Sequence, residues 1–130
     1  MSVLTGDFLA PYLLSSFDKG VGMMKMLKKT PIDYLFWGNP VQDLEHASVL
    51  DRKREYKGVC INSNMESHES FKYSKCQVDF AVVHIQSPDG FNTLKVGMCG
   101  ILSADPKLYQ PGAFGGATID DLWECVKYYN

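Results

Sequence analysis

The stretch AVVHIQSPDGFNTLKVGMCG, residues 81–100, decides how the second half of this 130-residue chain is expected to fold. It consists of two apolar runs rich in β-branched residues, which predict strands, joined by a short polar connection. Ser87-Pro88-Asp89-Gly90 is typical of a type I turn, with proline at the second position and glycine at the fourth. The pattern therefore predicts a β-hairpin with a three-residue loop and a glycine bulge.

That loop fixes which side chains share a face of the hairpin. It places Ser87 opposite Phe91, and the strand pairing follows from this contact. His84 then lies on a largely apolar face, while Asp79 and Cys99 lie opposite each other on the second face. A shift of one residue would mix the two sets, because side chains alternate along a strand. We therefore expect His84 to be half-buried at the rim of the apolar face, with Cys99 pointing away from it.

The order of elements along the chain indicates the fold class. Three segments have the composition of strands and predict an antiparallel β-meander of three or more strands, at about 55–62, 71–86 and 91–103. Segments with helical spacing of apolar residues lie before and after them, at 7–19, 23–29, about 40–50 (capped by Asn39) and 118–129 (capped by Thr118). Helices, then a meander, then a C-terminal amphipathic helix favour an α+β fold over a parallel α/β sheet. We expect one domain over residues 1–130, the size of an ordinary domain.

Composition and charge exclude several classes of protein. Hydrophobic residues make up 45% of the chain and charged residues 22%, which is typical of a globular domain. The formal net charge of -2 gives no overall field that would favour nucleic acid or an anionic membrane. Because no run of 18 or more apolar residues occurs, we expect no contact with the membrane. The N-terminus lacks the basic start of a signal peptide, so we expect a cytoplasmic protein, or a virion protein if the chain is viral.

Catalytic and metal-binding patterns are weak. The four cysteines lack the C-x-x-C spacing of zinc sites, and a carboxylate opposite Cys99 would disfavour its reactive thiolate. Glu66, His68 and Glu69 would hold a divalent ion only weakly. The loop FGGAT, residues 114–118, offers backbone amides to an anion, but the acidic residues that follow it would repel phosphate. We therefore predict no catalytic residue, no metal and no cofactor.

The leading functional hypothesis comes from the aromatic and methionine content. Seven tyrosines, seven phenylalanines, two tryptophans and six methionines are many for this length, and these residue types are enriched in interface cores. We predict a non-enzymatic protein-interaction or assembly subunit, a structural component of a larger complex such as a virus particle. Its partner would be another protein or a second copy of the chain. The candidate contact residues are Met23, Met24, Met26, Tyr34, Phe36 and Trp37.

Two alternatives belong to other functional classes. The first is a small-molecule-binding domain or small enzyme with a pocket between the sheet and the helices, and its nearest polar groups would be His84, Asp79 and Cys99. The second is a nucleic-acid-binding accessory protein, which would use aromatic stacking and a basic patch. The residues of that basic patch are Arg52, Lys53, Arg54 and Lys57.

Overall fold

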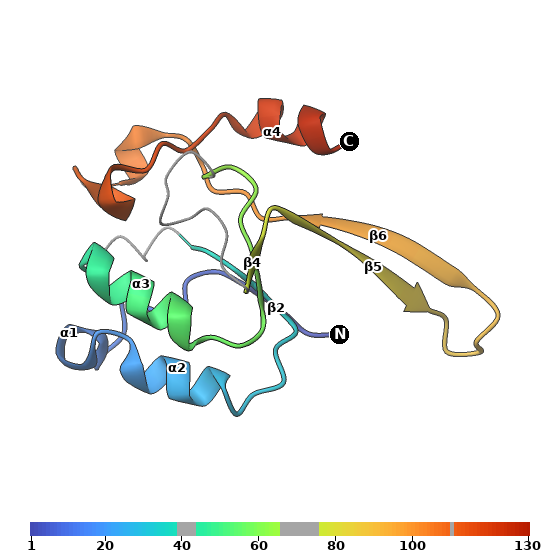
Figure 1. Cartoon of the computed structure of the whole chain (residues 1–130), viewed down its shortest axis with the longest axis horizontal. Coiled ribbons are helices and arrows are strands. Elements are labelled where there is room, and N and C mark those ends of the chain that lie inside the picture. Colours follow the sequence, from blue (N-terminus) through green and yellow to red (C-terminus); the bar gives the residue numbers. More distant parts are fainter. Residues whose placement is uncertain (39–43, 66–75, 110) are drawn as a thin grey trace.

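A parallel sheet of four short strands forms the centre of the protein (Figure 1). The computed structural model describes residues 1–38, 44–65, 76–109 and 111–130. The strands pair in the order β1 (Val3–Thr5), β2 (Tyr34–Phe36), β3 (Val59–Ile61) and β4 (Gln77–Val78). The remaining pair, β5 (Phe80–Gln86) and β6 (Thr93–Cys99), is an antiparallel hairpin that forms a separate sheet.

Helices connect the strands of the parallel sheet. The chain passes through α1 (Ser15–Asp18) and α2 (Val21–Leu27) between β1 and β2, and through α3 (His46–Glu55) between β2 and β3. Because crossovers between neighbouring parallel strands are right-handed, α2 and α3 lie on the same side of the sheet (Figure 1). After the hairpin come the short 3-10 turns η2 (Pro106–Leu108) and η3 (Ala113–Gly116), and the C-terminal helix α4 (Leu122–Tyr129).

The hydrophobic core lies between the parallel sheet and these helices. Leu35 and Cys60 are the central residues of β2 and β3, and both are buried against Met24 of α2 and Val49 of α3. The core continues into the segment after the hairpin, and its buried members are Phe8, Leu9, Met24, Leu27, Leu35, Trp37, Val49, Tyr56, Cys60, Met65, Leu102 and Phe114.

The predicted antiparallel meander is wrong, because the sheet at the centre of the molecule is parallel and the fold is a mixed α/β fold. The segment 55–62 supplies only the three residues of β3, which pair with β2 and β4 in parallel. Of the segment 71–86, residues 71–75 lie outside the described residues, and the rest is divided at Asp79 into β4 and β5, which belong to different sheets. The segment 91–103 contributes β6 alone. Only the hairpin of the predicted meander is antiparallel.

The helix boundaries also differ from those expected. The predicted helix at 7–19 is reduced to the four residues of α1, because the backbone is left-handed at Asp7 (φ 57°) and at Lys19 (φ 49°), where α1 ends. The helix expected at about 40–50 is α3, which ends only at Glu55, and three basic residues in its last turn complement the helix dipole. Its expected cap, Asn39, lies outside the described residues.

The C-terminal helix begins three residues later than expected from Thr118. Asp121 caps it, since its side chain accepts hydrogen bonds from the backbone amides of Trp123 (2.8 Å) and Glu124 (3.1 Å). The preceding residue, Asp120, has its amide hydrogen-bonded to the carbonyl oxygen of Asn64 at 2.8 Å. That bond ties the segment before α4 to the turn after β3.

A polar turn after β3 joins the sheet to the C-terminal segment. Asn64 is fully buried, and its side chain donates to the carbonyl oxygens of Leu102 (2.8 Å) and Asp120 (3.0 Å) and accepts from the amide of Leu102 (2.9 Å). Beside it, Ser63 Oγ accepts from the amide of Gly100 at 2.9 Å. One short turn therefore satisfies backbone groups from two distant parts of the chain.

Candidate interaction surface

The β5–β6 hairpin projects from the rest of the molecule (Figure 1). Residues 80–99 are here called the arm. Among the described elements, each arm strand has the other as its main contact. An isolated two-stranded hairpin is marginally stable in water, so the arm is a segment that would gain stability from a further partner.

The pairing of the arm differs by one residue from the predicted register. Phe80 lies opposite Cys99 and His84 opposite Lys95, and the bond from the amide of Ser87 to the carbonyl oxygen of Asn92 closes a four-residue loop. The predicted turn does form, because the amide of Gly90 donates to the carbonyl oxygen of Ser87 at 2.9 Å. The predicted three-residue loop and its strand register are wrong.

Side chains in the loop explain the extra residue. Asp89 Oδ1 accepts hydrogen bonds from Ser87 Oγ and from the amide of Phe91, and Ser87 Oγ accepts from the amide of Asn92. The hydroxyl of Ser87 and the amide of Phe91 hold the pKa of Asp89 below its ordinary value. These local bonds stabilise the longer loop. Phe91 then stands at the tip of the arm with 89% of its side chain exposed.

The register produces one arm face without a polar residue. Strand pairs share a face, so the residues that lie together on the apolar arm face are Ala81, Val83, Ile85, Leu94, Val96 and Met98. Near the tip, Ile85 is 41% exposed and Leu94 is 63% exposed, whereas the others are half-buried. Next to this face an open groove of about 650 Å³ separates β5 from the body, between His84 and Tyr34.

The second arm face, called the mixed face, continues onto α4. Phe80 packs against Tyr129 with a ring-centroid distance of 5.4 Å, and half of the Phe80 surface stays exposed. The predicted apolar stripe of the C-terminal helix is largely exposed as well, since Trp123 and Val126 face outward and Cys125 is the buried residue of α4. Apolar surface therefore runs from the root of the arm along α4.

The three polar residues predicted for a ligand pocket do not meet. His84 and Cys99 share the mixed face, four positions apart along the strands, which corresponds to about 13 Å. Asp79 precedes the arm and lines a separate groove with Ser63 and Glu124. The expectation that His84 lies at the rim of the apolar face was wrong, because the longer loop moves it to the mixed face.

Three of the six predicted contact residues, Met23, Met24 and Trp37, belong to the core or pack against it. Met24 and Trp37 are buried, and Met23, Tyr34 and Phe36 are partly covered. Met26 is the exposed member of the set, at 62%. The surplus of large apolar residues reaches the surface elsewhere, in the arm, in α4 and around α1.

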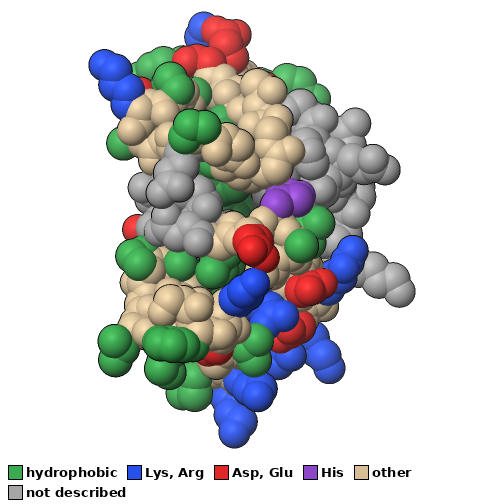
Figure 2. Space-filling view, turned by 90° about the vertical axis from the view of Figure 1, so that its left-hand side faces the viewer, with side chains coloured by type: hydrophobic (Ala, Val, Ile, Leu, Met, Phe, Trp, Pro, Cys, Tyr) green, Lys and Arg blue, Asp and Glu red, His purple; other side chains and the backbone are tan. Residues whose placement is uncertain are grey.

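The predicted basic patch is not an open cationic surface. Lys53 is buried, and Arg52 Nη2 forms an ion pair with Glu55 at 2.9 Å. Arg54 pairs with Asp51 at 3.1 Å, and Lys57 is exposed. Figure 2 shows acidic side chains interspersed with the basic ones over this part of the molecule. Mixed charges of this kind give little attraction for phosphate.

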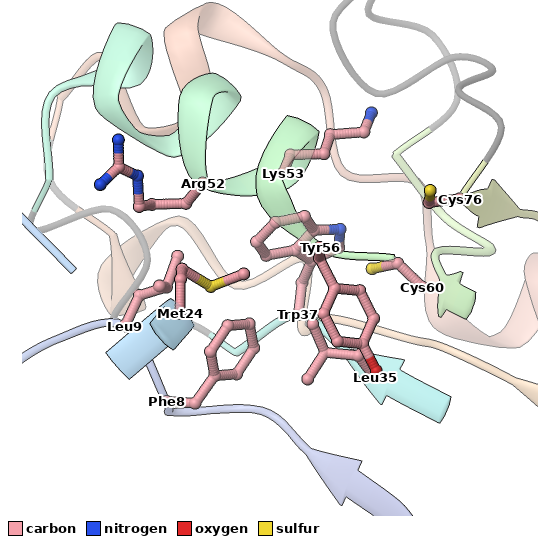
Figure 3. Close-up of a pocket in the computed structure, with 10 residues that line it drawn as sticks. All are labelled: Phe8, Leu9, Met24, Leu35, Trp37, Arg52, Lys53, Tyr56, Cys60 and Cys76. Atoms are coloured by element: carbon pink, nitrogen blue, oxygen red, sulfur yellow. The ribbon is translucent and has the colours of Figure 1, made fainter. Parts of the chain in front are cut away.

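The space between the parallel sheet and its helices is filled (Figure 3). Phe8, Met24 and Trp37 close it from one side, and Tyr56 and Cys60 from the other. The remaining cavity is about 10 Å³, no more than one water molecule needs. Burial raises the pKa of the Cys60 thiol to about 12, although the charge of Lys53 acts in the opposite direction.

One polar group in the interior was missed by the sequence analysis. Asn62 follows β3 at the carboxyl edge of the parallel sheet and is 2% exposed. Within the described part of the chain, its Nδ2 atom has no hydrogen-bond acceptor. Buried polar groups are normally paired. An asparagine directly after a three-residue strand carries no pattern that would have distinguished it from a loop residue.

Neither the metal trio nor the anion loop forms a site that the structure describes. Glu66, His68 and Glu69 lie outside the described residues, and no group of three ligand side chains occurs within them. The loop FGGAT ends well before α4 begins at Leu122, and Gly115 instead packs against the ring of His46. Its amides therefore do not form the start of α4.

Comparisons with known proteins name no family for this chain. A scan against models of protein families gives no match, and a search of curated proteins gives none either. In the parts of the chain with described coordinates, no helix is long and apolar enough to cross a membrane. The interpretation of the surface therefore depends on its geometry and chemistry.

Proposed function

We propose that this chain acts through protein contacts, as a subunit of a larger assembly, and that the arm is its contact surface. The observation that supports the proposal most directly is the apolar arm face, whose residues near the tip remain exposed. Contiguous exposed apolar surface is a common mark of interaction sites. Both outer edges of the hairpin also offer backbone groups for pairing with an added strand.

A second copy of the chain is the partner that this surface suits best. A two-fold interface brings the same patch from both copies together, so like charges on that patch would repel. The apolar arm face carries no charged side chain, and Lys95 and His84 lie on the mixed face. Two arms packed face to face would form a small sandwich with apolar residues inside. Because the surface is small, we expect a weak dimer, with a dissociation constant on the order of micromolar.

Charge introduced on the apolar arm face tests this proposal. We expect Leu94→Lys to abolish association, because a lysine within a two-fold apolar contact would be desolvated. Leu94 is 63% exposed, so the substitution should leave the folded monomer intact. Sedimentation velocity across a range of micromolar concentrations measures the association directly.

Thr93→Lys is the matched control, since Thr93 is the adjacent exposed residue and points to the mixed face. It adds the same charge one position away and should leave association unchanged. Association that is equally sensitive to both substitutions would assign the contact to net charge rather than to the apolar face. A wild-type chain that remains monomeric throughout the range would exclude a second copy as the partner.

The other functions considered are less well supported. Binding of a small molecule between the sheet and the helices is disfavoured by the filled interior around Trp37 and Cys60. Nucleic-acid binding is disfavoured because Lys53 is buried and Arg54 is paired with a carboxylate. If nucleic acid did bind, affinity would fall steeply with salt, so titration at two ionic strengths distinguishes this function from a protein contact.

A further inference from the structure

Two cysteines from different parts of the chain lie together at the junction of β3 and β4. We propose that Cys60 and Cys76 form a redox-active thiol pair, which closes an intramolecular disulfide on exposure to an oxidant of the glutathione disulfide class. All four cysteines are free thiols in this structure. The inference is independent of the proposed assembly role, because it concerns a covalent modification that is measured on the chain itself.

The backbone brings the two residues within bridging range. The amide of Cys60 donates to the carbonyl oxygen of Cys76 at 2.6 Å, and the next residue, Gln77, is the register partner of Cys60. Neighbouring strands are about 4.8 Å apart, and disulfides usually join residues with Cα atoms roughly 4.4–6.8 Å apart. The strand pairing therefore places the two backbones within the distance that a disulfide spans.

Both residues also line the same small cavity of about 10 Å³ in the core. Figure 3 shows the Cys60 sulfur pointing into this cavity and Cys76 at its edge. The sulfur atoms are close enough for a charge on Cys76 to raise the pKa of Cys60. Formation of the disulfide then requires rotation of the two side chains toward each other.

The different burial of the two thiols sets the order of the reaction. Cys60 is buried, at 3% exposure, whereas Cys76 is partly exposed and is the thiol that glutathione disulfide can reach. The Cys76 thiolate attacks one sulfur of the oxidant and forms a mixed disulfide, and the first glutathione leaves as a thiolate. Burial raises the pKa of the Cys60 thiol, and the charge of Lys53 offsets this effect only in part.

In the second step, the Cys60 thiolate attacks the Cys76 sulfur and displaces the second glutathione. The protons lost by the two cysteines are taken up by the two glutathione thiolates. The two protein thiols are thus oxidised to one disulfide, and glutathione disulfide is reduced to two molecules of glutathione. No further reactant is required.

The disulfide would attach the strand that leads into the arm covalently to the central sheet. β4 has two residues and is followed, after Asp79, by β5. A covalent bond between Cys60 and Cys76 would attach this short strand to β3. Cross-links of this kind stabilise chiefly by restricting the unfolded chain, so the oxidised protein should unfold at a higher temperature than the reduced one.

Peptide mapping tests the inference on the full chain. The folded protein is incubated with glutathione disulfide, quenched with acid, denatured and alkylated, and then digested for mass spectrometry. We expect a cross-linked species that joins the peptides containing Cys60 and Cys76 and is lighter by two hydrogen atoms. Both residues should escape alkylation, and treatment with dithiothreitol should restore it.

Two serine variants make the result specific. Cys99→Ser, in the arm, should still form the cross-link, whereas Cys76→Ser should leave Cys60 fully alkylated after denaturation. Cys76 is only partly buried, so its serine variant is expected to fold, and circular dichroism checks this. The proposal is overturned if Cys76 keeps a stable glutathione adduct while Cys60 remains a free thiol. It is equally overturned if Cys60 and Cys76 stay reduced while the exposed Cys99 reacts.

Discussion

Replacing Asn64 with alanine is expected to lower the free energy of unfolding by about 3–5 kcal/mol, because the side chain satisfies three buried or part-buried backbone groups. Two of these groups belong to Leu102 and one to Asp120. Each unsatisfied group costs about 1–3 kcal/mol, and alanine offers none of them a partner. Such a loss is a large part of the roughly 5–15 kcal/mol that holds an ordinary domain together. Urea unfolding followed by tryptophan fluorescence measures it.

Two further variants make this prediction specific. Asn64→Asp keeps the shape of the side chain but removes the donor to both carbonyl oxygens, so it should be destabilised to a similar extent. Asn92→Ala, in the exposed arm loop, should change stability by less than about 0.5 kcal/mol. An Asn64→Ala protein with the wild-type unfolding midpoint would show that the turn after β3 is not the link between the sheet and the C-terminal segment.

Gly100→Ala is expected to destabilise the protein by about 3 kcal/mol or more, because the segment after β6 passes directly over β3. A Cβ atom at Gly100 would lie 2.3 Å from the carbonyl oxygen of Ile61 and 2.9 Å from Cδ1 of Phe36. The carbonyl is part of the backbone of the central sheet, so relief of the clash requires a shift of β3 or of the root of the arm. Thermal unfolding gives the size of the loss.

Gly97→Ala provides a control in the adjacent strand β6. No described heavy atom lies within 4 Å of a Cβ atom at Gly97, and alanine reduces the conformational freedom of the unfolded chain. We therefore expect a neutral or slightly stabilising effect. Equal destabilisation by the two substitutions would indicate a general intolerance of β6 to side chains, and would contradict the close approach of Gly100 to the sheet.

The local elements were easier to predict from the sequence than their assembly. The hairpin was predicted because β5 and β6 are long and rich in β-branched residues, and because Ser87-Pro88-Asp89-Gly90 specifies a turn. The parallel strands have only two or three residues each, too few for a periodic pattern to be recognised. The alternation of such short strands with helices would have been the available signal for a parallel sheet.

Predicting the contact surface required the correct length of the hairpin loop, and an error of one residue changed which side chains share a face. A three-residue loop would have placed Lys95 opposite Val83, whereas the four-residue loop gathers only apolar side chains on one face. The hydrogen bonds of Asp89 with Ser87 and with the amide of Phe91, which stabilise that loop, depend on side-chain geometry that turn propensities do not specify. Two of the predicted contact residues, Met24 and Trp37, are buried. Aromatic content indicates excess apolar surface, but the tertiary fold decides which of it is buried.

Amide hydrogen exchange of residues 80–99, measured at low and high protein concentration, tests the role of the arm most directly. If the arm is the contact surface, its amides exchange much faster than those of β2 and β3 in the dilute protein and become protected as the concentration rises. Leu94→Lys should remove this concentration dependence and leave the parallel sheet unaffected. Arm amides that are protected as strongly as the central sheet at the lowest concentration, and unchanged at the highest, would contradict the account.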